Sequence, residues 1–341
     1  MQKNSEKFIQ KQRSKRHPTA IVRYVTLPAD LALAACCTQH LPKEYSKKVI
    51  TSGGVWLNKK RRTNPDEIIS KGSTLKIYLC PTQGYQYLFS KEFIIEETDD
   101  WVLVFKEPLV TTSMDRSNKY FNLMAGLNNY YHFNDMSHGV QPITRLDYQV
   151  AGLCLFSKKK HAERKLFTAM QHRQIKKRYL IAIPHSKLLR STSTRFRVSN
   201  HLTYINKAKE DSTIGKKSTT WFVPSHQTDT LCFFHALSKT GRRHQIRYHA
   251  STTLGPLMND WLYGNQYNRN HHTIGLIANQ ISFPWNKQKI TISLPKKWIN
   301  LWMTWVAWEG PLEKIRGGRL FSRMMALQRG RLIKALYLNS Y

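Results

Sequence analysis

Short apolar runs separated by insertions of varying length constrain the fold of this chain most. Runs of this length, flanked by turn residues, are typical of buried strands. Because their spacing is irregular, the pattern predicts a sheet-dominated α+β fold and argues against regular alternation of strand and helix. One helix is expected from about Lys159 to Arg173. The runs are FIIEE, WVLVFKEPL, GLCLFS, RYLIAIP, TWFVP, LCFFHAL, ISFPW and KITISLP.

The chain carries a large excess of positive charge: 54 Lys and Arg against 21 Asp and Glu, a formal net charge of +33. Such a surface repels itself unless a polyanion or an acidic membrane leaflet neutralises it, and counterion release from phosphates drives much of nucleic-acid binding. The sequence contains no run of about 18 to 20 apolar residues, the length needed to span a membrane. The basic N-terminus lacks the apolar core of a signal peptide. We therefore expect a cytoplasmic protein that binds nucleic acid.

The five cysteines show no metal-binding spacing. They form no Cys-x-x-Cys or Cys/His pattern of the kind that zinc needs, and an odd number without a disulfide framework predicts reduced, partly buried thiols. The adjacent His271 and His272 would point to opposite faces of a strand, so a solvated loop pair is expected. The cysteines are Cys36, Cys37, Cys80, Cys154 and Cys232.

Changes of composition divide the chain into five predicted segments. In the last one, Trp302, Trp305 and Trp308 are spaced as on one face of a helix, which favours packing over base stacking, and an Arg-rich tail follows. The segments are a basic arm over residues 1–26, a small module over 27–79, a linker over 80–91, a large domain over 92–298 and a helical basic extension over 299–341.

The small module has an order of its own. A helix with Asp30 as its possible cap is followed by a second helix that stops at Gly53 and Gly54, and then by short strands. This order resembles the RNA-binding module of ribosomal small-subunit protein four. The resemblance implies a basic face able to grip phosphates; the alternative is a solvated charged hairpin. The residues of this face are Lys47, Lys48, Lys59, Lys60, Arg61 and Arg62.

Three motifs carry the chemistry of the large domain. They are ITRLDYQVAG at 143–152, KKRYLIAI at 176–183 and TGRRHQIRYHA at 240–250. In this order they resemble the signatures H-R-L-D-x-x-T-S-G, Lys-x-Tyr and T-G-R-x-H-Q-I-R-x-H of the RluA-type RNA pseudouridine synthases. The resemblance covers roughly residues 27–298. It implies an isomerase that converts uridine to pseudouridine in RNA, with a mixed, largely antiparallel sheet and a basic cleft.

The resemblance also implies roles for individual residues. Asp147 corresponds to the catalytic aspartate, Tyr179 to the tyrosine that packs against the target base, and Arg247 to the arginine that pairs with the aspartate. The isomerisation changes no oxidation state, so no cofactor or metal is expected. The implied substrate-binding residues are Arg145, Lys177, Arg242, His244 and Leu276, and a basic helix contributes Lys158 and Lys159 to RNA binding. The partner is expected to be ribosomal RNA first and transfer RNA second, and the protein to be a monomer.

Several positions depart from the family pattern. Thr144 stands where a His is usual, Val150 and Ala151 replace Thr-Ser, Phe105 replaces an Asn, and Ile277 replaces another His. None of them removes a group that the reaction requires. They leave open a rival reading, a non-catalytic RNA-binding or ribosome-assembly protein on the same scaffold.

A second rival is a glycosidase or nucleosidase. Such an enzyme needs two carboxylates that flank the scissile bond. Asp260 is the possible second acid, but its segment favours a structural turn. A serine hydrolase is excluded because no G-x-S-x-G motif provides a nucleophile.

Overall fold

The structure, a computed structural model, describes residues 10–13, 21–27, 29–80, 82–132, 139–185, 194–204, 207–264 and 273–307. The chain divides into two compact units. The smaller unit contains the described residues up to Phe89 together with Ser113–Tyr131, and the larger unit contains Ser90–Thr112 and the described residues from His132 onward. The N-terminal stretches 1–9 and 14–20, His271, His272, Trp308 and the Arg-rich tail lie outside the described residues.

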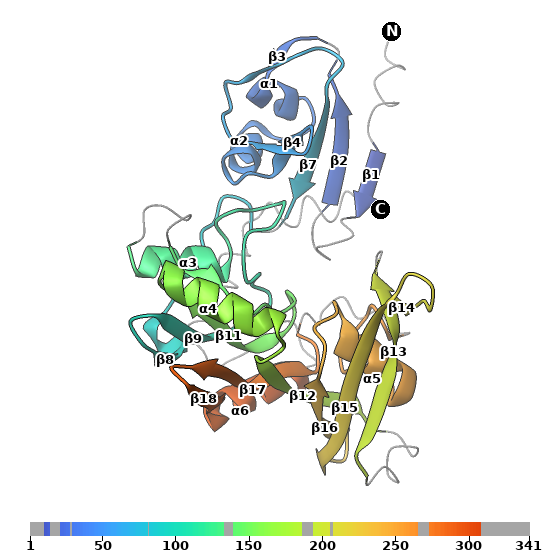
Figure 1. The fold of residues 1–341 in the computed structure, drawn as a ribbon. Helices are drawn as coiled ribbons and strands as arrows, with labels where there is room; N and C mark the ends of the chain where they lie inside the picture. The colour runs from blue at the N-terminus through green and yellow to red at the C-terminus, as the bar shows by residue number, and fades with distance from the viewer. Residues whose placement is uncertain are drawn as a thin grey trace. The chain divides into compact units, whose positions relative to one another are not determined.

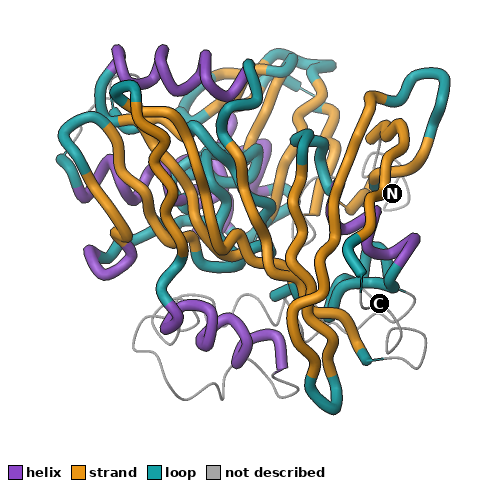
Figure 2. The backbone as a smooth tube through the Cα atoms, turned by 60° about the horizontal axis from the view of Figure 1, so that its bottom comes forward, coloured by secondary structure: helices purple, strands orange, loops and turns teal. Residues whose placement is uncertain are grey.

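The larger unit is built on one mixed sheet of 11 strands, in the order β14-β13-β15-β16-β12-β17-β11-β9-β8, with β10 beside β11 and β18 beside β17. Only the pairing of β11 with β17 is parallel among its described strands. This architecture confirms the predicted sheet-dominated α+β class, and Figure 2 shows the strong twist of the long strands. The strands are β8 (Ile94–Glu97), β9 (Trp101–Lys106), β10 (Gln141–Pro142), β11 (Ala151–Ser157), β12 (Lys176–Pro184), β13 (Phe196–Tyr204), β14 (Ala208–Glu210), β15 (Lys216–Gln227), β16 (Leu231–Ser238), β17 (Leu276–Trp285) and β18 (Gln288–Ser293).

Three helices pack on this sheet: α4 (Lys160–Gln171), α5 (Gln245–Thr253) and α6 (Lys296–Ala307). Helix α4 matches the predicted helix to within two residues at each end, and α5 begins within the predicted motif at 240–250. The buried strands β9 and β11 lie at the centre of the core, where every residue of both is buried. Figure 1 shows α5 against the strands β13 and β15.

Gly152 allows the one parallel pairing. It is the Cα partner of Ala278 in β17 and has φ +121, and a Cβ built on it would lie 2.4 to 2.8 Å from backbone atoms of Ala278. Only glycine tolerates both this conformation and this approach. The glycine that closes the motif at 143–152 therefore sets the distance between β11 and β17.

The smaller unit has its own sheet, in the order β1-β2-β7-β4-β5, covered by two short helices. Its core contains Leu33, Val49, Ile50, Leu75 and Ile77, all fully buried. A third helix, α3 (Leu123–Tyr130), lies in the second part of the unit, Ser113–Tyr131. The other elements are β1 (Gln10–Arg13), β2 (Ile21–Thr26), β3 (Leu31–Ala32), α1 (Leu33–Thr38), α2 (Lys43–Thr51), β4 (Val55–Leu57), β5 (Lys60–Arg62), β6 (Ile68–Ile69) and β7 (Thr74–Leu79).

The segment boundaries differ from the predicted ones in three places. Strand β2 pairs with β7, so the end of the predicted arm at 1–26 belongs to the sheet of the smaller unit. The predicted linker at 80–91 is also part of that unit up to Phe89: Gln83 Nε2 donates to the Ser117 carbonyl at 2.6 Å and Tyr87 stacks edge-on with Phe121. These contacts join segments distant in sequence, which a composition change does not reveal.

The third difference concerns the C-terminal boundary at residue 298. Helix α6 begins at Lys296 and packs Trp298 on Phe105 of β9, with ring centroids 4.3 Å apart. Trp302 and Trp305 are buried as well, as the predicted packing stripe requires. The helix therefore belongs to the larger unit, and Phe105, one of the departures from the family pattern, serves as its packing partner.

Asp30 does not cap the first helix, contrary to the prediction. Helix α1 begins at Leu33 after Ala32, and the Asp30 carboxylate accepts a hydrogen bond from the Lys71 backbone at 2.5 Å. The short strand pair β3–β6 intervenes and moves the helix start.

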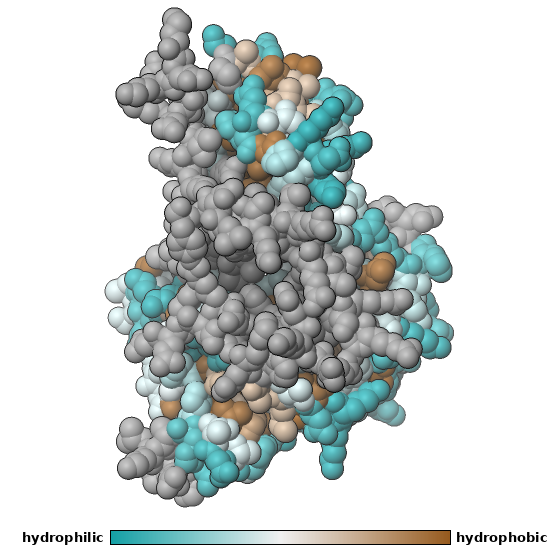
Figure 3. Space-filling model, turned by 180° about the vertical axis from the view of Figure 1, so that it is seen from behind, coloured by the Kyte–Doolittle hydropathy of each residue, from teal (hydrophilic) through white to brown (hydrophobic). Residues whose placement is uncertain are grey.

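The surface and the thiols carry few further signals. The five cysteines are buried and form no disulfide with one another. No helix within the described ranges is long and apolar enough to cross a bilayer, and no group of His, Cys, Asp and Glu side chains in the described part of the chain is arranged to hold a metal ion. Among the described residues visible in Figure 3, hydrophobic side chains form small patches between hydrophilic ones.

Candidate active site

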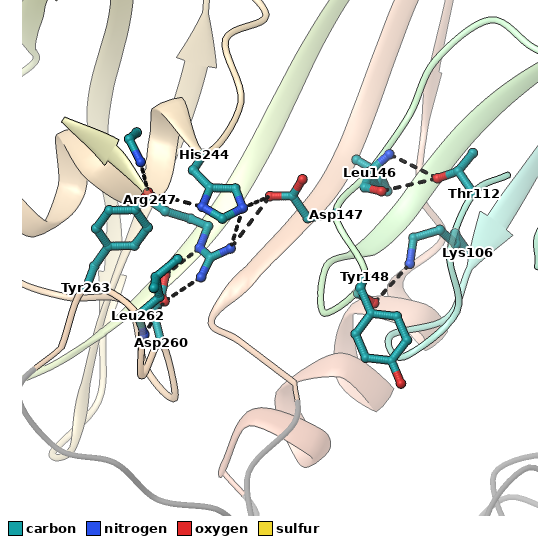
Figure 4. A network of polar contacts seen from close by, with 11 residues as sticks. Lys106, Thr112, Leu146, Asp147, Tyr148, His244, Arg247, Asp260, Leu262 and Tyr263 are labelled. Atoms are coloured by element: carbon teal, nitrogen blue, oxygen red, sulfur yellow. Dashed lines mark hydrogen bonds and ion pairs between the residues drawn. The ribbon is translucent and has the colours of Figure 1, made fainter. Parts of the chain in front are cut away.

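Asp147 lies in the loop between β10 and β11, at the edge of the central strands. Its side chain is 34 % exposed. The two neighbouring residues are held by hydrogen bonds. The Thr112 hydroxyl both donates to the Leu146 carbonyl and accepts from the Leu146 N–H, at 3.2 Å each. The Tyr148 carbonyl accepts from the Leu109 N–H at 2.7 Å and from Lys106 Nζ at 3.4 Å. Figure 4 shows these contacts on one side of the loop and Asp147 directed to the other.

Lys106 is a fully buried lysine beneath this loop. Besides the Tyr148 carbonyl, its ammonium donates to the carbonyls of Glu107 at 2.8 Å and Val110 at 2.7 Å. Burial lowers its pKa to about 8, although the charges of Cys154, Asp147 and Glu107 oppose this change. A buried cation with three carbonyl acceptors pins the backbone on the C-terminal side of Asp147.

Arg247, on α5, faces the Asp147 carboxylate, with Nη1 3.7 Å from Oδ2. Its closest partner is Asp260. Arg247 Nε and Nη2 each donate to a different oxygen of this fully buried carboxylate at 2.7 Å. Burial alone would lower the pKa of Arg247, but the charge and hydrogen bonds of Asp260, with a further contribution from Asp147, raise it. The guanidinium is thus fixed by one carboxylate and presented to another.

His244 completes this group. It precedes α5 with a left-handed backbone, φ +55. Its Nε2 accepts a hydrogen bond from Arg247 Nη1 at 3.1 Å and its Nδ1 lies 3.1 Å from the Tyr263 hydroxyl. Burial, followed by the charge of Arg247, lowers its pKa to about 4. His244 is therefore neutral, with its proton on Nδ1, and Nε2 has no proton to give to Asp147 Oδ2 at 3.5 Å. The cation that faces Asp147 from this side is Arg247.

Tyr179 approaches the same region from β12. It is 7 % exposed and is the Cα partner of Ala278 in β17, as is Gly152 of β11 on the opposite side. Leu276 pairs with Ile181, two residues along β12, and so shares the sheet face of Tyr179. The predicted base-packing tyrosine and pocket leucine therefore lie together on one face of neighbouring strands.

Lys177 links Tyr179 to the loop of Asp147. Its ammonium donates to the Arg145 carbonyl at 3.3 Å and lies 5.5 Å from the centre of the Tyr179 ring. Burial would lower its pKa, but Tyr179, followed by Cys154 and Asp147, outweighs this effect and raises the pKa. Lys177, Lys106 and Arg247 thus form a cationic surround for the Asp147 carboxylate.

The other predicted substrate-binding residues lie nearer solvent. Arg145 is exposed. Arg242 donates to the Lys217 carbonyl at 3.2 Å and helps to line a shallow pocket of about 210 Å³. Tyr204, another wall of this pocket, lies edge-on to His244 with ring centroids 5.1 Å apart. Arg242 is thus placed beside the site but makes no described contact with Asp147.

The predicted RNA-binding lysines fall into two groups. Lys158 and Lys159 are paired with carboxylates, Lys158 with Glu97 at 2.6 Å and Lys159 with Asp100 at 3.4 Å, so their charges are partly neutralised. In the smaller unit Lys47, Lys48, Lys59 and Lys60 are exposed.

The two predicted arginines of the smaller unit are tied to the protein. Arg61 donates to the Asp115 carbonyl and stacks over Trp56, with its guanidinium carbon 4.9 Å from the ring centre. Burial lowers its pKa, against the charges of Asp115 and Tyr120. Arg62 forms an ion pair with Glu67 at 2.8 Å. Both arginines thus contribute to the structure of this unit.

Sequence reasoning missed the role of Asp260. The signal was present, because the segment GPLMNDWLYG at 255–264, which contains Asp260, resembles the signature G-x-P-x-x-x-D-x-x-Y-G of the RluA-type synthases. Its carboxylate is taken up by Arg247, so it cannot serve as the second acid of a glycosidase. The substituted Thr144 is also structural: it is buried, and its hydroxyl accepts from the Leu155 N–H at 3.0 Å.

The comparison with protein families bears on this arrangement. The family described as RNA pseudouridylate synthase matches residues 100–252, which include Asp147, Tyr179 and Arg247. Residues 100–252 thus match the RNA pseudouridylate synthase family. The chain is also similar to other proteins over a longer range. The ribosomal large subunit pseudouridine synthase C of Buchnera aphidicola is 25 % identical over 284 residues, covering 75 % of this chain and 86 % of that protein.

A further relative and a solved structure are also similar to this chain. The uncharacterized RNA pseudouridine synthase YjbO of Bacillus subtilis is 27 % identical over 172 residues, which are 50 % of this chain and 60 % of that protein. This chain therefore matches less than two thirds of YjbO. Among solved structures, human RNA pseudouridylate synthase domain containing 4 aligns with a TM-score of 0.50 at 15 % identity, over 64 % of this chain and 95 % of that one. At this identity the likeness concerns the fold alone.

Proposed function

We propose that the protein is an RNA pseudouridine synthase that uses Asp147 as its nucleophile. The observation that carries the proposal is the position of this carboxylate. It is partly exposed, it lies on a loop pinned from both sides, and it faces an arginine that a second, buried carboxylate holds in place. A carboxylate in such a site can attack an electrophilic carbon while a fixed cation aligns it.

The reaction needs no group from outside the chain. Asp147 attacks either the ribose carbon that carries the base, so that the bond from this carbon to N1 breaks, or C6 of the uracil ring, after which the same carbon–N1 bond breaks. The ring then rotates, its C5 bonds to the ribose carbon, the bond to Asp147 breaks, the C5 proton is lost and N1 takes up a proton. Tyr179 and Leu276 would pack against the base, and Tyr179 would take part in proton removal. Arg145 would enter the space that the flipped uridine leaves in the RNA.

We propose ribosomal RNA as the substrate, with transfer RNA as the alternative. The net charge of +33 and the similarity to a ribosomal large subunit pseudouridine synthase of Buchnera aphidicola support a large, structured RNA. The smaller unit would act as an RNA-binding module like that of ribosomal small-subunit protein four, with Lys47, Lys48, Lys59 and Lys60 as its exposed cations. We expect the protein to act as a cytoplasmic monomer.

The test is Asp147→Asn, with Asp229→Asn on an exposed turn as a matched control. Pseudouridine is mapped by chemical labelling and primer extension in RNA from cells that lack the protein and are supplied with each variant. The Asp147 variant should bind RNA but restore no pseudouridine, whereas the wild type and the control should restore it. Modification by the Asp147 variant would disprove the assignment of the nucleophile. A wild type that binds RNA and modifies none would favour the non-catalytic alternative.

A further inference from the structure

Three of four neighbouring strands in the large sheet carry positive charge, and none of the four carries a carboxylate. Strands β13, β15 and β12 contain Lys or Arg, the intervening β16 contains His235, and all four lack Asp and Glu. Ordinary solvated surfaces intersperse both signs of charge. A sheet region of one sign therefore indicates a partner of the opposite sign.

A row of residues that includes two of these arginines lies across the four strands on the face opposite to the active site. Tyr179, Ala236 and Phe222 are successive cross-strand partners, so they share the active-site face. The next row lies one residue away from the first along each strand. This row is Arg178, Leu237, Trp221 and Arg197, again as successive partners across four strands. Because neighbouring residues of a strand point to opposite faces, this row lies on the back of the sheet.

Trp221 is the centre of this back face. Its half-exposed ring has the Arg195 guanidinium carbon 4.5 Å from its centre, that of Arg197 at 5.8 Å and the Lys239 ammonium at 6.0 Å. Lys217 lies on the same face of β15, four residues before Trp221. All four cations are exposed. An indole holds guanidinium groups by cation–π attraction and so fixes charges that would otherwise move apart.

These charges are unpaired within the described residues. No described carboxylate forms an ion pair with Arg195, Arg197, Lys217 or Lys239. In the same row, Arg178 Nε is buried and makes no hydrogen bond to a described residue. Burial and the charge of Arg178 together lower the pKa of the neighbouring His235. Like charges thus lie close together on the back face, and no described carboxylate compensates their mutual repulsion.

We propose that the Trp221 face, defined as Arg195, Arg197, Lys217, Trp221 and Lys239, is a second RNA-binding surface that holds phosphates of the substrate at a distance from the target uridine. The proposal rests on the proposed function, which supplies RNA as the polyanion. Arginines held over an aromatic ring match the phosphates and bases of RNA, and phosphate contacts set the orientation of the nucleic acid without reading its sequence. A substrate that reaches both faces must pass around the edge of the sheet, as a folded stem-loop or a larger RNA can.

The test removes the four charges together in R195Q/R197Q/K217Q/K239Q. Binding of a fluorescein-labelled RNA stem-loop is measured by anisotropy over a series of salt concentrations. Each lost phosphate contact makes the dependence of log Kd on log salt less steep, so the slope should fall by roughly 3. The double variant R195Q/R197Q should give about half of this change. It keeps the test valid if the quadruple variant does not fold.

The matched control removes four exposed charges near the β17–β18 turn and the start of α6: K287Q/K289Q/K296Q/K297Q. Its slope should stay close to that of the wild type. Equal losses in both quadruple variants would show an effect of net charge alone and would overturn the proposal. A Trp221-face variant that binds RNA normally but no longer binds phosphatidylserine vesicles would overturn it too, in favour of a membrane contact.

Activity separates this proposal from the assigned reaction. With RNA from cells that lack the protein as substrate, the Trp221-face variants should show a KM raised about tenfold or more and an unchanged kcat. If the wild type forms pseudouridine and these variants match it in KM and in anisotropy, the second surface is disproved and the reaction stands. If the wild type forms none while the salt slope still falls, the reaction is disproved and the RNA-binding surface stands.

Discussion

Asp260 holds Arg247 by two parallel hydrogen bonds of 2.7 Å, and this leaves Arg247 Nη1 as the one guanidinium nitrogen that faces Asp147. The buried carboxylate thus sets the direction of the cation that the proposed reaction would use. Because both side chains are buried, loss of one of them would leave the other as an uncompensated buried charge and lower the stability of the fold.

Asp260→Asn should therefore reduce both stability and activity. The substitution leaves Arg247 buried with one neutral partner, which costs about 3 to 5 kcal/mol in the free energy of unfolding when a buried pair is broken. The freed guanidinium should turn toward Asp147, so kcat should fall more than RNA affinity. Urea unfolding and single-turnover modification measure the two effects. A variant with wild-type kcat would show that Asp260 does not position Arg247.

Gly152→Ala should destabilise the junction of β11 and β17. A Cβ would lie within 2.8 Å of the Ala278 backbone, and φ +121 is a strained conformation for alanine. The expected loss is about 1 to 3 kcal/mol, as for other overpacked cores. Gly241→Ala is the matched control, because nothing lies within 4 Å of its added Cβ and its φ is not in the left-handed region. Equal unfolding midpoints for the two variants would contradict the role of Gly152.

His249 should make the protein sensitive to acid. It is fully buried between Ser218, Thr220 and Asn200, and burial lowers its pKa from 6.5 to about 4. Between these two pH values the unfolded chain binds a proton that the folded chain does not. Stability therefore falls as pH drops from 6.5 toward 4, by about 3 kcal/mol from this residue.

His249→Gln tests this directly, because glutamine does not titrate in this range. The variant should be less stable than the wild type at pH 7 but should lose less stability on acidification. Thermal unfolding at several pH values gives both quantities. His244, whose pKa is also lowered to about 4, would supply the remaining slope. A slope unchanged by the substitution would rule out His249 as a source.

The sequence predicted the components of the site better than their connections. The motif at 240–250 identified Arg247 and His244, and the apolar runs predicted the sheet. The pairing of Arg247 with Asp260 depends on how the turn after α5 folds back, and an aspartate near a glycine reads locally as a turn residue. Likewise the burial of residues 80–89 depends on partners at 113–131, and tertiary contacts of this kind leave no periodic signal.

The ends of the helices also could be predicted only where local sequence features determine them. Helix α4 was predicted well because its apolar stripe and charged face are both local features. Helix α1 was misplaced because the two-residue pairing of β3 with β6, 37 residues apart, decides where it begins. Local propensity is a weak guide wherever a distant strand fixes the backbone.

Lys106→Met offers the last test, since it addresses a residue that touches the catalytic loop from below. The ammonium holds the carbonyls of Glu107, Val110 and Tyr148, and Tyr148 follows Asp147 directly. Methionine fills a similar volume but leaves these carbonyls without their donor, so the loop should shift. Because a small misplacement of a reacting group can cost about a hundredfold in rate, kcat should fall at least about tenfold.

RNA affinity should change little in this variant, since Lys106 is fully buried and cannot reach a phosphate. Lys296→Met, on the exposed start of α6, provides the matched loss of charge and should leave kcat unchanged. Single-turnover rates and anisotropy on the same RNA separate the two quantities. If Lys106→Met weakened RNA binding but kept the wild-type kcat, the lysine would act on the substrate and not on the loop, and the pinned position of Asp147 would have to be explained by Thr112 alone.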